Sequence, residues 1–276
     1  MRVAVVGHIE WIDFVRVPRM PGRGEIIHAV EAWDEPGGGG AVAAVQLAKL
    51  AGTADFFTTV GDDNLGRRAR VELALMNLKV HAGIRKEPQR RAITFIDSSG
   101  DRSITVLGVR SSPSSADDLP WELLEGADAV YLTAGDIQAV RLARRAKVLV
   151  ATSRILPLLN EAAVELDALV GSSVDPSERY VDGDLSPAPK LVVRSASEAG
   201  GTYRVAGGPV LTYPATPLPG PLVDTYGCGD SFAAGLTFGL GLGLPPDEAV
   251  RLAARCGAAV ATGRGPYPAQ LTRADL

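Results

Sequence analysis

The sequence predicts an α/β fold in which a mainly parallel sheet is covered by helices on both faces. Short apolar segments alternate with segments of helical periodicity over most of the 276 residues, and repeated strand–helix units form parallel sheets. Two less regular regions, at about 9–35 and 91–107, interrupt this alternation and predict a small second sheet beside the main one. Neither an internal repeat nor a low-complexity linker divides the chain, so residues 1–276 are expected to form one domain.

The individual elements follow from periodicity and from the glycines and turn residues between them. Apolar segments that predict strands of the main sheet lie at 3–6, 56–60, 129–133, 147–151, 167–170 and 190–194. Period-two alternation predicts a strand at 26–33 and hairpins at 91–97 with 102–107 and at 202–205 with 210–213. Helical periodicity between glycine or Asp/Asn boundaries predicts helices at 41–51, from 61–64 through 76, after 230 and at 247–262.

The composition excludes several classes of protein. Hydrophobic residues make up 46% of the chain and charged residues 22%, which is typical of a globular protein. The formal net charge is −4, without a long basic run, which argues against nucleic acid or an anionic membrane as the main partner. Two cysteines are too few for a disulfide framework or a zinc site. The start lacks the long apolar core of a signal peptide, so we expect a cytoplasmic protein.

The stretch Asp-Thr-Tyr-Gly-Cys-Gly-Asp at residues 224–230 stands directly before a helical pattern. Two glycines at a helix entrance let backbone N–H groups converge on an anion such as a phosphate. A carboxylate among these donors fits a site that deprotonates a hydroxyl while it stabilises the phosphoryl group under attack. Because Asp is also a favoured N-cap residue, the alternative is that Asp230 simply caps the helix.

The glycine run at residues 37–40 is a second candidate site. It opens the helix at 41–51, and its bare backbone either lets a ligand approach closely or forms a flexible turn. A dinucleotide fingerprint fits loosely from Gly38 to Ala43, but the residues before it are not the buried strand that this fingerprint requires. In open parallel sheets, ligands bind beyond the carboxyl ends of the strands, which groups this run with Gly7 and the 224–230 stretch.

These motifs together resemble the ribokinase-like (PfkB) carbohydrate kinase family. Residues 224–230 are similar to its Asp-Thr-x-Gly-Ala-Gly-Asp motif, with Cys228 at the Ala position. Similar motifs of the family are a Pro-Gly-Glu turn at 22–25, a Gly-Gly-Lys-Gly-Ala-Asn signature at 37–42 and a Val-Gly-x-Asp-x-x-Gly stretch at 60–66. The resemblance covers nearly the whole chain and implies a three-layer α/β/α fold with a small β-sheet lid, formed from about 9–35 and 91–107.

The resemblance implies an ATP-dependent kinase that phosphorylates a hydroxymethyl group of a sugar or sugar-like molecule. Asp230 would be the general base, and the backbone of Gly227, Cys228 and Gly229 would form an anion hole. An acidic residue near the first strand would bind the substrate, either Asp13, six residues after Gly7, or Glu10. Further substrate contacts implied by the glycine signature are Gly38, Gly39, Gly40 and Val42.

The chain departs from the family pattern around the substrate, the metal and the nucleotide. Gly39 replaces the usual Lys and Val42 the usual Asn, which suggests a different or less polar substrate. Asn-x-x-Glu appears as Ser172-x-x-Asp175, so Asp175 would support Mg²⁺. Nucleotide contacts implied by the resemblance are Ser195 and Ser197, which stand for Thr-x-Gly, together with Thr225 and Arg255; a monovalent cation beside Asp224 and Thr225 is a further option.

Two alternatives to a sugar kinase follow from these departures. A nucleoside kinase of the same family would need an aromatic platform for a base, for which Trp11 and Trp33 lie in suitable segments. A catalytically degenerate member would bind a ligand without turnover, an interpretation favoured by Val42, Ser197 and Arg255 and opposed by the intact Asp230 motif. The resemblance also implies a homodimer formed through the lid.

Overall fold

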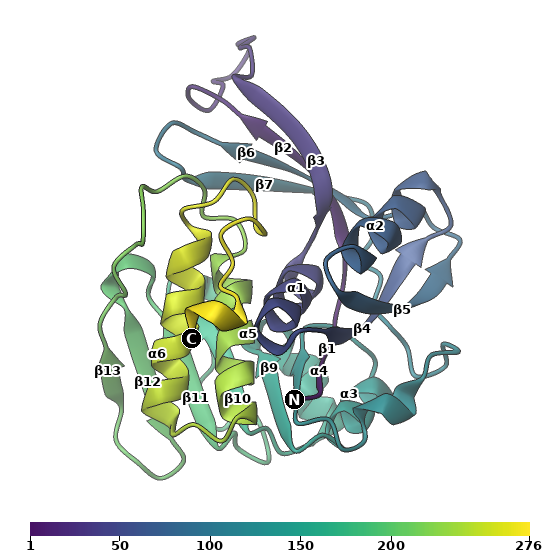
Figure 1. The fold of residues 1–276 in the computed structure, drawn as a ribbon, viewed down its shortest axis with the longest axis vertical. Coiled ribbons are helices and arrows are strands. Elements are labelled where there is room, and N and C mark those ends of the chain that lie inside the picture. Colours follow the sequence, from purple (N-terminus) through teal and green to yellow (C-terminus); the bar gives the residue numbers. More distant parts are fainter.

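The computed structural model describes residues 1–276 and contains two sheets and six α-helices (Figure 1). The strands of the large sheet are β1 (Val3–Val6), β4 (Ala54–Gly61), β5 (Leu78–Arg85), β8 (Ala129–Leu132), β9 (Val148–Thr152), β10 (Ala168–Ser172), β11 (Leu191–Ser195), β12 (Gly201–Val205) and β13 (Leu211–Tyr213). Their spatial order is β13-β12-β11-β10-β9-β8-β1-β4-β5, and every pair from β11 to β5 is parallel. The added strands β12 and β13 are antiparallel.

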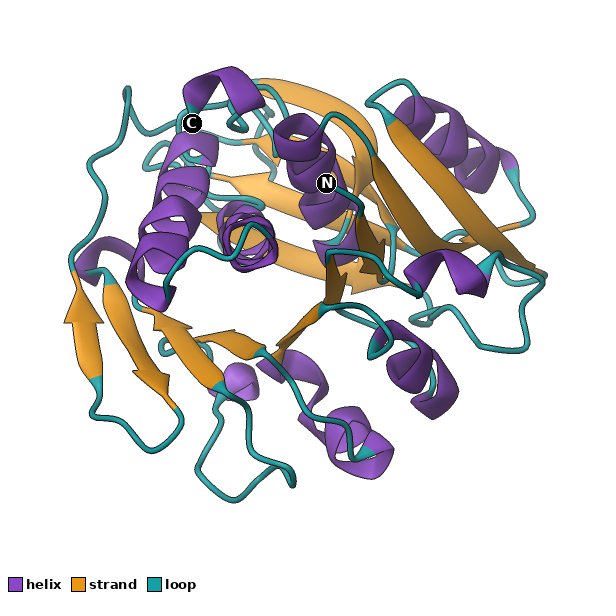
Figure 2. Cartoon of the chain, turned by 60° about the horizontal axis from the view of Figure 1, so that its bottom comes forward, coloured by secondary structure: helices purple, strands orange, loops and turns teal.

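Helices cover both faces of this sheet (Figure 2). They are α1 (Gly39–Ala51), α2 (Asn64–Ala74), α3 (Ile137–Ala143), α4 (Leu156–Ala162), α5 (Cys228–Gly241) and α6 (Pro246–Val260). Strand β1 shows how the two cores are divided, because Val3 and Val5 face α1, α5 and α6 whereas Ala4 and Val6 face α3 and α4. The predicted three-layer α/β/α fold with a mainly parallel sheet is therefore confirmed.

A four-stranded sheet lies across one end of this body (Figure 1). It contains β2 (Glu10–Arg16), β3 (Glu31–Gly37), β6 (Arg91–Ile96) and β7 (Arg102–Leu107) in the order β3-β2-β6-β7. Strands β2 and β6 are parallel and the other neighbours are antiparallel. We call this sheet the lid. All residues of its edge strand β7 are exposed, and the homodimer through the lid stays a prediction.

The sequence misplaced one strand and missed two others, of which β2 forms from the mixed segment after Gly7 by pairing with β3 and β6. The strand predicted at 26–33 begins only at Glu31, because the alternating residues before it do not face a core, and the Ile26 side chain is 93% exposed. The observed strand extends through Pro36, which β3 tolerates as the outermost strand of the lid. Strand β5 was not predicted from its mixed sequence, and pairing with β4 forms it.

The parallel strands deliver the residues that follow them to one edge of the large sheet. Gly7 follows β1, Thr133 follows β8, Ser153 follows β9, and Ser172 and Ser195 end the paired strands β10 and β11. This edge lies under the lid and is the expected place for a ligand in such a fold. None of the helices has the length and apolar character needed to cross a membrane.

Candidate active site

Asp230 lies in the first turn of α5 without capping it. The N-cap is Gly227, whose φ of 82° is in the left-handed region, and the first backbone bond of the helix runs from Ser231 N to Gly227 O at 2.9 Å. The amides of Cys228 and Gly229 precede that bond and therefore have no helical partner. The Asp230 carboxylate forms no hydrogen bond or ion pair within the protein, so the helix-cap alternative is wrong.

The two glycine-rich stretches meet at this carboxylate. A Cβ atom added to Gly39 would lie only 2.8 Å from Asp230 Oδ1, so a side chain at position 39 would press against the carboxylate. Tyr226 also holds the two stretches together, because its hydroxyl accepts a hydrogen bond of 2.9 Å from Gly38 N. The entrance of α1 and the entrance of α5 thus form one site, with Asp230 between them.

Burial and neighbouring charges set the protonation of Asp230. Desolvation raises the pKa of its carboxyl to about 6, although the side chain stays partly exposed. The guanidinium groups of Arg102 and Arg154 lower this pKa, whereas Glu178 and Glu10 raise it. A carboxylate with a pKa near 6 is largely ionised at neutral pH yet basic enough to accept a proton, as a general base requires.

Cys228 and Val42 support the site without presenting a polar side chain to it. Burial raises the pKa of the Cys228 thiol to about 12, so sulfur is present as a neutral thiol. Val42 is fully buried, and its Cγ1 would lie 2.9 Å from a Cβ at Gly227. The predicted substrate contact of its side chain is therefore corrected, because Val42 is buried against the turn at Gly227. Gly40 is likewise buried against His8 and Gly7.

Strand alternation decides between the two acidic residues of β2. Glu10, Ile12 and Phe14 share one face, and Phe14 packs edge-on against Tyr226 of the 224–230 stretch. Asp13 lies on the other face, where it pairs with Arg91 at 2.8 Å. The proposed substrate role of Asp13 is therefore corrected, and Glu10 is the acidic residue of β2 on the side of Asp230.

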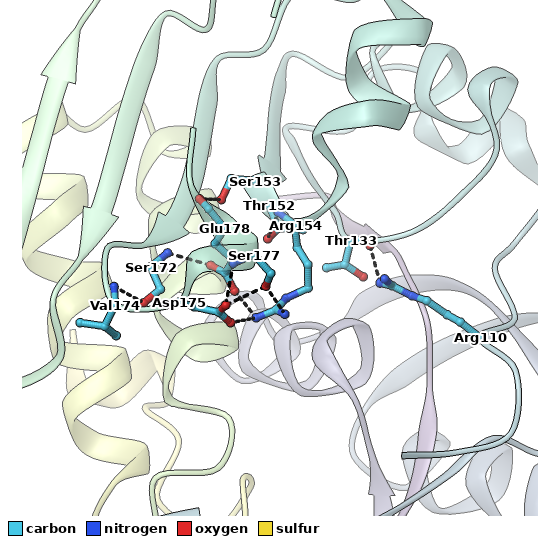
Figure 3. Close-up of polar contacts among 10 residues, drawn as sticks. All are labelled: Arg110, Thr133, Thr152, Ser153, Arg154, Ser172, Val174, Asp175, Ser177 and Glu178. Carbon is cyan, nitrogen blue, oxygen red and sulfur yellow. Dashed lines mark hydrogen bonds and ion pairs between the residues drawn. The ribbon is translucent and has the colours of Figure 1, made fainter. Parts of the chain in front are cut away.

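His8 borders the glycine run beside Asp230, and Arg110 contacts His8. Carbon atoms of the His8 ring would lie 3.3 Å from a Cβ at Gly38 and 3.5 Å from one at Gly39. Arg110 Nη2 lies 3.0 Å from His8 Nδ1 and donates to the carbonyl oxygen of Thr133 at 3.0 Å (Figure 3). Burial, and next the charge of Arg110, lower the pKa of His8, so the ring is neutral. With Nδ1 as acceptor, Nε2 carries the proton.

A polar cluster follows β9 and β10 and contains a carboxylate that the sequence analysis missed (Figure 3). Arg154 forms ion pairs with Asp175, at 2.8 Å, and with Glu178. Glu178 Oε2 also accepts a hydrogen bond of 2.7 Å from Ser172 N. The Glu178 side chain is 14% exposed and that of Asp175 37%, and only Glu178 is among the charges that act on Asp230. In the sequence, the feature that could have identified Glu178 is its place three residues after Asp175. In the structure it ends the short 3₁₀ turn of 176–178.

Asp175 and Glu178 match the small number of protein ligands that Mg²⁺ has when it binds beside a nucleotide. Mg²⁺ usually binds one or two carboxylates together with substrate phosphates and water. No group of three or more acidic, His or Cys side chains in the chain could by itself hold a metal ion. Asp175 and Glu178 fit the smaller requirement. Asp224 does not, because its two oxygens accept hydrogen bonds from Tyr226 N and Gly265 N in a fully buried position.

The residues expected at the nucleotide lie in three places. Ser195 pairs with Ser172 across β10 and β11, and Ser197, with φ of 50°, opens the turn that follows. Thr225 is bound by Arg102 of the lid, which donates to its carbonyl oxygen at 2.6 Å and to its hydroxyl at 2.9 Å. Arg255 is exposed on α6 and donates to the carbonyl oxygen of Asp275. Ser195 therefore lies beside the cluster of Arg154, Asp175 and Glu178. Arg255 instead binds the C-terminal segment.

A cavity of about 660 Å³ borders the cluster of Arg154, Asp175 and Glu178. Its lining residues include Ser172, Asp175, Glu178, Arg194, Tyr203 and Arg204. None of residues 227–230 lines it, so this cavity is separate from the site of the candidate base.

Neither tryptophan offers a free platform for a nucleobase. The Trp33 ring stacks on Phe14, with centroids 4.8 Å apart, and Arg264 lies 3.9 Å from its centroid. The Trp11 ring is buried under Arg68, and its Nε1 donates to Asp34. Both rings are used in packing the lid, which removes the feature that favoured a nucleoside kinase.

Comparisons with known proteins identify the family of the chain. A family model described as "pfkB family carbohydrate kinase" matches residues 1–200 and 165–273. A fructokinase of Klebsiella pneumoniae is 29% identical over 282 residues, covering 87% of this chain and 90% of the relative. A ribokinase of Arabidopsis thaliana is 24% identical over 302 residues, covering 99% and 79%. The solved structure of Arabidopsis thaliana ribokinase with ribose and ATP has a TM-score of 0.78 at 22% identity, covering 99% of this chain and 96% of that one. The chain belongs to the pfkB family of carbohydrate kinases.

Proposed function

We propose that this kinase transfers the γ-phosphoryl group of ATP to a hydroxymethyl group of a sugar or sugar-like small molecule, with Asp230 as general base. The observation that carries the proposal is the Asp230 carboxylate, which has no protein partner and lies at the mouth of α5 against Gly39. Family membership and the relatives named fructokinase and ribokinase support the type of reaction. A related structure that holds ribose and ATP supports ATP as donor.

In the proposed reaction the acceptor hydroxyl gives its proton to Asp230 as its oxygen forms a bond to the γ-phosphorus. The bond between that phosphorus and the oxygen bridging to the β-phosphate breaks, and ADP leaves. The unpaired amides of Cys228 and Gly229 face the helix entrance and would stabilise the charge on the transferred group. Such catalysis consists mostly of positioning and charge stabilisation.

Glu178, Asp175 and Arg154 would serve the nucleotide side of the site. Bound Mg²⁺ would supply charge neutralisation at the β- and γ-phosphates. Glu178 is the better placed of the two carboxylates to support it, because it is more buried and acts on Asp230. In the protein alone, the single guanidinium of Arg154 pairs with both carboxylates and neutralises one of their two charges.

The test is ADP release from Mg-ATP with a panel of sugars, polyols, sugar acids and nucleosides. We expect stimulation by at least one acceptor, and a decrease in kcat of at least ~100-fold in Asp230→Asn with little change in ATP affinity. Asp247→Asn is the matched control, because Asp247 is also a first-turn carboxylate but lies exposed on α6.

Two results would replace the proposal. Stimulation by nucleosides alone would make the chain a nucleoside kinase. Thermal stabilisation by a compound without any turnover would make it a binding protein built on a kinase fold. Near-normal turnover in Asp230→Asn would remove this carboxylate from the mechanism.

A further inference from the structure

Arg110 is exposed at the edge of the site, and only part of its guanidinium has a protein partner. It lies in the segment that leaves lid strand β7 and crosses the ends of β1 and β8, where Ser111 is held by a 2.7 Å hydrogen bond from Thr59. Only its Nη2 atom has partners, namely His8 and the carbonyl oxygen of Thr133. No Asp or Glu forms an ion pair with Arg110, so Nε and Nη1 remain available to a ligand.

Arg90 adds a second guanidinium to the same region. Its Nε lies 3.0 Å from Glu10 Oε1, and its buried Nη1 has no hydrogen-bond partner. Burial and the like charge of Arg90 lower the pKa of Arg110, whereas the charge of Glu10 raises it. One carboxylate, Glu10, therefore faces two guanidinium groups. Arg154, the next cation, is already balanced by Asp175 and Glu178.

The His8–Arg110 pair lies beside the candidate base. The His8 ring borders Gly38 and Gly39, and the space that a side chain at Gly39 would fill borders Asp230. A molecule over Gly39 would therefore border both the Asp230 carboxylate and the His8 ring, which Arg110 contacts. Because the glycine run offers no polar side chain, recognition of the acceptor falls to His8, Glu10 and Arg110.

We propose that the acceptor of this kinase is anionic, a sugar or polyol that bears a carboxylate or phosphate away from the hydroxyl that is phosphorylated. The anionic group binds Arg110, with the charge of Arg90 behind it, and the hydroxyl reaches Asp230. The inference rests on the proposed function for the identity of the site. It concerns binding, however, and binding can be measured without turnover.

The experiment compares acceptor pairs that differ in the charged group. Gluconate is paired with sorbitol, and ribose 1-phosphate with methyl riboside, so that every probe keeps a terminal hydroxymethyl. Calorimetry with Mg-ADP present gives each affinity, and ADP release gives kcat/KM. We expect the charged member of at least one pair to bind at least ~10-fold more tightly, since hydrogen bonds to charged groups contribute about 1.5–3 kcal/mol. Which pair responds identifies carboxylate or phosphate.

Variants assign the effect to Arg110. Arg110→Gln should remove the preference for the charged member and leave the affinity of the neutral member within ~3-fold, and Arg110→Lys should restore part of it. Arg145→Gln is the control, because Arg145 is exposed in the layer of α3 and meets only Glu125 at 4.0 Å.

The inference is overturned if the neutral member binds as tightly in both pairs, if neither charged probe binds, or if Arg110→Gln weakens both members equally. Turnover of a neutral sugar in preference to every charged probe would overturn it while leaving the kinase function intact. Binding of a charged probe without any turnover would reject the kinase function and support the inference.

Discussion

Replacing Asp230 with asparagine is expected to stop turnover and at the same time to stabilise the folded protein. The pKa of this carboxyl rises from 3.8 to about 6 on folding, with desolvation as the main cause. Between these two values the folded state holds the proton more tightly than the unfolded state. Stability therefore falls as pH rises from about 4 to about 6, and above pH 6 the ionised carboxylate destabilises the fold.

The magnitude follows from the size of the shift. About two pKa units correspond to about 3 kcal/mol at 1.36 kcal/mol per unit. Because the side chain is partly exposed and solvent screens it, we expect roughly 1–3 kcal/mol for Asp230→Asn at pH 8. For a chain of this size each kcal/mol raises Tm by about 2–4 °C, so the increase should be at least a few degrees.

The assay is thermal unfolding of wild type and variant at pH 8 and at pH 4, with ADP release at pH 8. The stability difference should be present at pH 8 and nearly vanish at pH 4, where the wild-type carboxyl is already protonated. Asp247→Asn should change Tm in the opposite direction at pH 8, since an exposed first-turn carboxylate stabilises its helix by about 0.3–1 kcal/mol. An Asp230→Asn protein that is no more stable than wild type at pH 8, or equally more stable at both pH values, would refute the reasoning.

Three further predictions concern the surroundings of the base. The kcat/KM of the wild type should fall about tenfold per pH unit below about pH 6. Arg102→Gln should move this decrease to higher pH, because Arg102 lowers the pKa of Asp230. If the decrease stays at the same pH in the variant, its pKa belongs to a group other than Asp230. Gly39→Ala should lower kcat at least ~10-fold by pressing on Asp230 while Tm stays the same or rises, since alanine favours helix; normal kcat would show that the carboxylate can move aside. Glu178→Gln should lower kcat at limiting Mg²⁺ more than Asp175→Asn does, and the reverse order in a Mg²⁺ titration would restore Asp175 to the metal role.

The hydrogen bonds from Arg102 of the lid to Thr225 could not be predicted from the sequence. Arg102 stands in a hairpin with ordinary alternation, and nothing in that pattern indicates a partner at Thr225, 123 residues away. The contact arises because lid strand β7 lies over the entrance of α5. The same holds for Glu178, whose importance depends on the turn that brings it back to Ser172 N.

Local sequence by itself determined the strand–helix alternation, the two glycine-rich helix entrances and the position of Asp230 at one of them. These features depend on periodicity and on backbone groups within a few residues. Only the tertiary structure decided that Glu10 rather than Asp13 lies on the side of Asp230, that Val42 packs below the 224–230 stretch, and that Arg110 forms no ion pair. Each of these depends on which face of an element is covered by a distant segment, and burial and charge balance are set by those neighbours rather than by the residue itself.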